Sequence, residues 1–85
     1  MRDAVQDQLL LGRALQAMRD SAGLTQEDLA ARLDIHPTYV SQVERGRRGV
    51  RWHTVLRFLD ALGASLHQLA EAIAEAERQQ RASGQ

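Results

Sequence analysis

The fold of this chain is decided by residues 25–46, which read TQEDLAARLDIHPTYVSQVERG. Thr25 is a favourable helix N-cap, and Asp28 stands three residues later, where its side chain can bond back to the cap. Glu27 adds negative charge at the positive end of the helix dipole. Three apolar residues form one inner face: Leu29, Ala30 and Leu33. This pattern predicts a short helix that ends at residue 32 or 33.

The second half of the stretch predicts another short helix after a tight turn. Pro37 has no backbone N–H to donate, so we expect His36 as the cap and Pro37 as the first helical residue. Val40 and Val43 form the inner face, and Gly46 ends the helix where a left-handed residue is favoured. Two short helices joined by a tight turn, the second with a polar outer face, are the geometry of a helix-turn-helix.

Apolar periodicity on both sides extends this pair into an all-α chain of about five helices. The first helix is expected over residues 3–21, with one apolar face made by Leu11, Leu15, Met18 and Ala22. Val5 and Leu10 fall off that face, so we expect the first residues of the chain to fray or to pack on a partner. The fourth helix, ended by Gly63, carries Trp52, Val55, Leu56, Leu59 and Leu62. The fifth begins near Ser65 and carries Leu66, Leu69, Ala70 and Ile73.

The length of 85 residues allows one small domain, which we expect over residues 11–75. Residues 1–10 are expected to extend the first helix, and the polar residues 76–85 to form a frayed tail. No run approaches the roughly 18 apolar residues of a membrane span, and the first residues lack a secretory signal pattern. Together with the absence of cysteine, this predicts a cytoplasmic protein without disulfides.

The charge is balanced in total but unevenly distributed. The chain has 11 basic and 11 acidic residues, a formal net charge of zero, and every basic residue is Arg. Between residues 36 and 57 the only acid is Glu44, and the basic residues are Arg45, Arg47, Arg48, Arg51 and Arg57. Salt screens charges beyond about 8–10 Å, so a local basic patch matters more for DNA binding than the net charge.

The chain resembles the family of phage lambda-type repressors and Cro proteins, also called the XRE family. The residues that carry the resemblance are 23–33 (GLTQEDLAARL) and 40–48 (VSQVERGRR). Leu11, Gly12, Leu15 and Arg19 are similar to the first helix of the family, and residues 54–56, 61–63 and 65–69 to its fourth and fifth. The resemblance covers roughly residues 11–73 and implies a compact five-helix, lambda-repressor-like DNA-binding domain with the helix-turn-helix in helices 2 and 3.

The resemblance also implies roles for single side chains. The base contacts implied on a recognition helix over about residues 37–45 are Thr38, Tyr39, Ser41 and Gln42. The phosphate contacts are Gln26, Arg45, Arg47 and Arg48, although Arg47, like Arg51, fits a solvated loop charge equally well. Arg19 and Glu44 match a structural ion pair that ties the first helix to the end of the third.

Four positions depart from the family pattern. Asp34 replaces the usual turn glycine, although Asp tolerates the left-handed conformation better than most residues. His36 replaces a Ser or Thr cap, Pro37 has no polar side chain for a base, and Tyr39 is larger than usual. From the residues alone, Gln42 suits adenine, Thr38 suits a thymine methyl group, and Arg45 suits guanine or phosphate.

The predicted function is that of a sequence-specific transcriptional regulator, a repressor in the first instance, binding a palindromic operator as a homodimer. Relatives often dimerise near the fifth helix, and the candidate interface here is Phe58, Leu66, Leu69 and Ile73. Trp52 is expected in the core rather than stacked on a base. The alternative is an antitoxin or adaptor of the same fold, which would bind a protein partner through residues 3–10 or 71–77.

Enzymatic and metal chemistry are not predicted. His36, His53 and His67 lack metal-ligand spacing, and no cysteine accompanies them. The serines have no evident His–carboxylate partners, so no nucleophile is indicated. We therefore expect double-stranded DNA as the partner, with no cofactor, no metal and no membrane contact.

Overall fold

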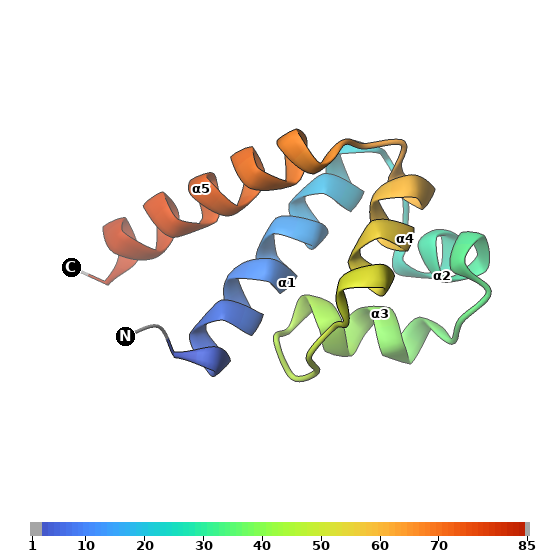
Figure 1. Ribbon diagram of the computed structural model, residues 1–85, viewed down its shortest axis with the longest axis horizontal. Coiled ribbons are helices and arrows are strands. Elements are labelled where there is room, and N and C mark those ends of the chain that lie inside the picture. The colour runs from blue at the N-terminus through green and yellow to red at the C-terminus, as the bar shows by residue number, and fades with distance from the viewer. Residues whose placement is uncertain (1–2, 85) are drawn as a thin grey trace.

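The computed structural model describes residues 3–84, which form five helices and no strand. The helices are α1 (Ala4–Ser21), α2 (Gln26–Leu33), α3 (Pro37–Glu44), α4 (Trp52–Leu62) and α5 (Leu66–Ser83). Figure 1 shows both chain ends at one end of the molecule and α2 at the other. The predicted all-α, five-helix architecture is confirmed.

The helix ends form as the capping residues predict. The Thr25 hydroxyl accepts a hydrogen bond from the Asp28 N–H at 3.0 Å, and the Asp28 carboxylate accepts one from the Thr25 N–H at 2.9 Å. His36 caps α3, because its Nδ1 accepts from the Thr38 N–H at 3.1 Å. Asp34 adopts the left-handed conformation with φ of 56°, so the turn keeps its shape without glycine.

One apolar core lies where the helices meet. Its largest fully buried side chains are Leu15 of α1, Leu29 of α2, Val40 and Val43 of α3, and Phe58 of α4. α5 packs along α1 and contributes Leu69 and Ala76. The core therefore supports α3 from behind and leaves its other side to solvent.

Close backbone approach fixes the end of α3 against α1. Gly12 is buried, and a Cβ there would lie 2.6 Å from the Glu44 carbonyl oxygen and closer still to that of Val43. Gly46 has φ of 71°, and a Cβ there would lie 2.6 Å from Leu9 Cδ2. A side chain at Gly12 would separate α1 from α3, so the position of α3 depends on this glycine.

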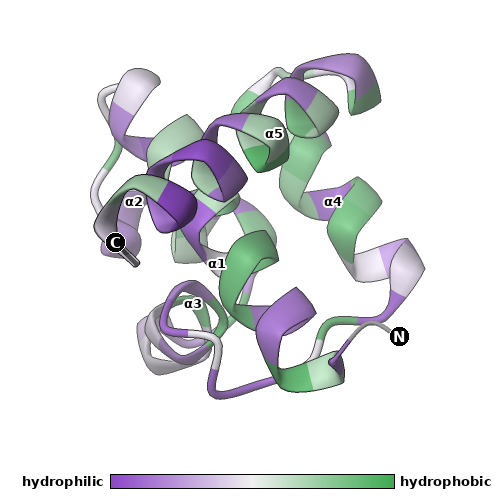
Figure 2. Cartoon of the chain, turned by 90° about the vertical axis from the view of Figure 1, so that its left-hand side faces the viewer, coloured by the Kyte–Doolittle hydropathy of each residue, from purple (hydrophilic) through white to green (hydrophobic). Residues whose placement is uncertain are grey.

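Three expectations about the helices outside residues 25–46 were wrong. Leu10 is buried at 5% exposure, although it lies off the predicted face of α1. The polar residues 76–83 are not frayed but continue α5 to Ser83, and Ala76 is buried. These two findings share a cause, since the extended α5 packs along α1 and covers its second side. Figure 2 shows the last turns of α5, next to the label C, coloured hydrophilic.

Trp52 is the third wrong expectation, because it is 60% exposed at the start of α4. None of the helices in the described part of the chain is long and apolar enough to cross a bilayer.

Candidate nucleic-acid interface

The outer face of α3 carries the polar side chains predicted for base contact. Val40 and Val43 point inward and are buried. On the opposite side Thr38 and Arg45 are exposed, and Ser41 and Gln42 are half-buried. This orientation leaves hydroxyl, amide and guanidinium groups accessible along one side of a helix narrow enough for a major groove. Contact with DNA by these residues stays a prediction.

Arginines without an acidic partner gather where α3 ends and in the loop that follows it. The members of this arginine cluster are Arg45, Arg47, Arg48 and Arg51, all exposed. Within residues 3–84 none of them forms an ion pair, which distinguishes them from arginines with structural roles elsewhere. Unpaired guanidinium groups attract phosphate, because the fork of donors matches its oxygens.

Arg57 does not belong to this cluster, although the sequence places it in the same basic stretch. Its Nη2 donates to the Leu33 carbonyl oxygen at 2.7 Å and so satisfies the end of α2. Arg32 does the same for α4, since its Nη1 donates to the Ala61 carbonyl oxygen at 2.9 Å. The sequence gives no signal for these long-range caps, because each joins residues more than 20 positions apart.

Tyr39 is half-buried rather than fully directed outward. Its ring packs against Phe58, with centroids 6.5 Å apart and planes tilted by 47°. The guanidinium carbon of Arg48 lies 4.9 Å from the centre of the Tyr39 ring. The ring therefore joins the core to the arginine cluster, a role that its predicted base contact did not anticipate.

Arg19 and Glu44 form a buried ion pair behind α3. The Arg19 Nε donates to Glu44 Oε2 at 2.6 Å, and its Nη2 donates to Oε1 at 3.0 Å. The Arg19 Nη1 donates to the Leu24 carbonyl oxygen at 2.7 Å. Hydrogen bonding to the Glu44 carboxylate raises the pKa of Arg19, so this guanidinium stays charged. The pair ties α1 to the last residue of α3 and thereby fixes the orientation of α3.

Gln26 joins the same network at the start of α2. Its Nε2 donates to Glu44 Oε1 at 2.9 Å, and the side chain is half-buried. For the predicted phosphate contact, the Gln26 side chain therefore has only its second amide hydrogen left to donate. The backbone N–H groups at the start of α2 can donate beside it.

The predicted dimer interface is wrong for two of its four residues. Phe58 is 0% exposed and Leu69 is 4% exposed within a single chain, so neither offers surface to a second copy. Leu66 is 48% exposed, and Ile73 is half-buried. The exposed apolar residues that were missed are Trp52 and Leu56, and their spacing of four residues on α4 is a signal the sequence contained.

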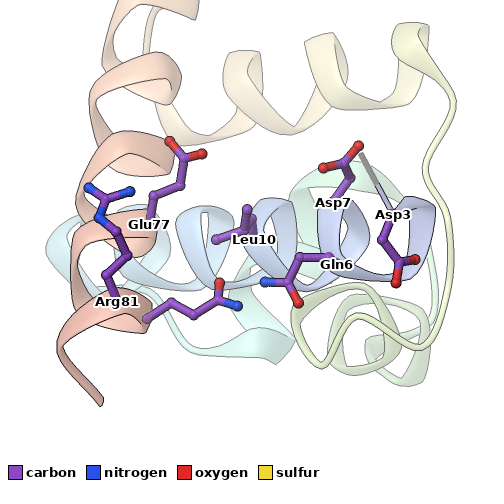
Figure 3. Close-up of a pocket in the computed structure, with 7 residues that line it drawn as sticks. Asp3, Gln6, Asp7, Leu10, Glu77 and Arg81 are labelled. Carbon is purple, nitrogen blue, oxygen red and sulfur yellow. The ribbon is translucent and has the colours of Figure 1, made fainter. Parts of the chain in front are cut away.

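A groove of about 480 Å³ lies between the start of α1 and the end of α5. Its lining residues are Asp3, Gln6, Asp7, Leu10, Glu77, Gln80 and Arg81. Figure 3 shows three carboxylates around it and Leu10 between the two helices. The groove brings residues 3–10 next to the end of the 71–77 stretch, the two segments named for a protein partner. Among residues 3–84, no three His or acidic side chains are placed to hold a metal ion.

Comparisons with known proteins agree with the helix-turn-helix formed by α2 and α3. A family model described as a helix-turn-helix domain matches residues 10–72. The control protein C.BamHI of Bacillus amyloliquefaciens is 36% identical over 64 residues, which are 74% of this chain and 79% of that protein.

Two solved structures are similar over most of the chain. The clp gene regulator ClgR from Corynebacterium glutamicum has a TM-score of 0.82 at 32% identity, covering 91% of this chain and 82% of that one. The restriction-modification controller protein C.Esp1396I, solved as a tetramer with its natural 35-base-pair operator, has a TM-score of 0.74 at 25% identity, covering 81% and 91%. Since the family model spans well over half of its residues, this protein belongs to the helix-turn-helix domain family.

Proposed function

We propose that the protein is a transcriptional regulator that binds a specific operator in double-stranded DNA, with α3 in the major groove. The observation that carries the proposal is the arginine cluster beside the polar face of α3. In this role Gln42 and Thr38 contact bases in the major groove, and Arg45 and Arg47 contact phosphates of the DNA backbone. The operator complex of C.Esp1396I, a similar structure, supports the same use of the fold.

The regulator acts as a homodimer on a palindromic site and represses transcription when its operator overlaps a promoter. A second copy related by a two-fold axis would set two α3 helices about 34 Å apart, one helical turn of DNA. The surface that supports dimerisation is the exposed apolar part of α4 and the start of α5, made by Trp52, Leu56 and Leu66. Burying these side chains between two copies would stabilise the dimer by about 25 cal/mol for each Å² of apolar surface removed from water.

The base-contacting role is tested by comparing two alanine variants on two DNA duplexes. Gln42→Ala should weaken binding to the operator fragment by about 1–3 kcal/mol and leave binding to random DNA unchanged. Arg47→Ala should weaken binding to both duplexes and reduce the salt slope by about 1. The matched control is Gln16→Ala, since Gln16 is exposed on α1 and belongs neither to α3 nor to the arginine cluster. Operator binding by Gln42→Ala equal to that of the wild type would contradict the assigned face.

A further inference from the structure

Arg48 is the one member of the arginine cluster that rests on an aromatic ring. Its guanidinium carbon lies 4.9 Å from the centre of the Tyr39 ring, inside the range of about 6 Å in which a cation is attracted to the ring face. Within residues 3–84, no acidic side chain pairs with Arg48 and no hydrogen bond holds it. The ring contact is therefore what restrains this side chain.

The ring that holds Arg48 is itself held by the core. Tyr39 packs on Phe58, which is fully buried, with ring centroids 6.5 Å apart. Contacts thus run from the core through Tyr39 on α3 to Arg48 in the loop after α3. The other three arginines of the cluster have no comparable ring contact in the described residues, so their long side chains keep more rotamer freedom.

A guanidinium stacked on a ring differs from one held by a carboxylate. The carboxylate occupies the N–H donors, whereas an aromatic face contacts the flat side of the group and leaves its edge donors free. Ordering a long side chain before binding also removes part of the entropy loss that binding otherwise incurs. A stacked arginine is therefore ready to donate to phosphate or guanine.

We propose that Tyr39 is a positioning residue, which holds Arg48 at the edge of the recognition surface for contact with DNA. This inference rests on the proposed function and adds a role for one residue. It replaces the direct base contact predicted for Tyr39: the aromatic ring, not the hydroxyl, supplies the effect. Within residues 3–84 the Tyr39 hydroxyl makes no hydrogen bond, so Tyr39→Phe keeps the ring and breaks no hydrogen bond.

The test is a double-mutant cycle between Tyr39→Leu and Arg48→Ala, measured on the DNA fragment upstream of the gene and on a random duplex. Each single change should weaken binding about three- to tenfold, and the double variant should bind about as weakly as Arg48→Ala alone. Tyr39→Phe should bind within about twofold of the wild type, because the ring remains. A matched cycle of Tyr39→Leu with Arg47→Ala should be additive, since Arg47 has no ring contact.

A second measurement needs neither the leucine variant nor DNA. In the wild type and in Tyr39→Phe, NMR relaxation at the Arg48 Nε should report a more ordered side chain than at the Arg47 Nε. Circular dichroism and thermal unfolding establish that each variant is folded at the temperature of the binding assay.

The outcomes separate this inference from the proposed function. Wild-type protein that binds neither duplex would overturn both. Wild-type binding with additive effects of Tyr39→Leu and Arg48→Ala would overturn the positioning role alone, as would equal disorder at the two arginines. Tyr39→Phe that binds as weakly as Tyr39→Leu would mean that the hydroxyl contacts DNA directly.

Discussion

Replacing Glu44 with leucine should destabilise the protein more than any change on its surface. The carboxylate is nearly fully buried and accepts three hydrogen bonds, two from Arg19 and one from Gln26. Leucine keeps much of the volume but removes the buried counter-charge of Arg19, whose remaining acidic partner is the exposed Asp20 carboxylate, 3.2 Å from its Nη1. Arg19 is 7% exposed, so water cannot replace the lost partner without opening the contact between α1 and α3.

The expected loss is about 3–5 kcal/mol in the free energy of unfolding, the usual cost of removing one partner from a buried ion pair. A domain of 85 residues has a total stability of about 4–13 kcal/mol, so Glu44→Leu removes a large share of it. The thermal midpoint should fall by at least about 12 °C, since each kcal/mol shifts a domain of this size by about 4–8 °C.

Urea unfolding followed by circular dichroism measures this loss directly. The matched control is Glu75→Leu, which breaks the exposed ion pair with Arg78 and should change stability by less than about 1 kcal/mol. The double variant Arg19→Met with Glu44→Leu should recover part of the stability, because no buried charge remains unpaired. Equal losses for Glu44→Leu and Glu75→Leu, or a double variant less stable than Glu44→Leu, would show that the buried ion pair does not stabilise the fold in this way.

Three further predictions concern stability. Gly12→Ala should lower the free energy of unfolding by about 3 kcal/mol in urea titrations, because its methyl group would meet the carbonyl oxygens at the end of α3; a loss under 1 kcal/mol would contradict that packing. Asp34→Val should cost about 1–2 kcal/mol by the same assay, since a branched side chain resists a φ of 56°, whereas Asp34→Gly should cost nothing. Hydrogen bonds from the Thr25 backbone and hydroxyl lower the pKa of Asp28 below its ordinary 3.8. The ionised Asp28 therefore stabilises the folded protein fully above that pH, and this stabilisation is lost as the pH falls through the lowered pKa of the folded state. The thermal midpoint of Asp28→Asn should therefore depend less on pH below about 4 than that of the wild type, and equal slopes would contradict the capping role.

Local chemistry explains which parts of the fold were predictable from the sequence. Thr25 with Asp28, and His36 with Pro37, act on their own backbone within a few residues, so their spacing identifies where α2 and α3 begin. The left-handed Asp34 and the inward Val40 and Val43 follow in the same way. The outer face of α3 was therefore predicted correctly as a polar, accessible surface.

Parts that depend on distant packing were not predictable. Periodicity identifies an apolar face but not what covers it, so Phe58 and Leu69 were assigned to a dimer and Trp52 to the core, the reverse of their exposure. The polar end of α5 remains helical because one side of it packs on α1 near Leu10. The Tyr39–Arg48 contact joins α3 to the loop that follows it, and no spacing rule describes it.

Binding of a specific operator by α3 and the arginine cluster can be measured by titrating the protein with the DNA upstream of its own gene. A random duplex is the control, and both are measured at two salt concentrations. We expect tight, saturable binding to the upstream fragment, at two chains per site, and weak, strongly salt-dependent binding to random DNA. Equal and weak binding to both duplexes would contradict this expectation and would direct attention to a protein partner instead.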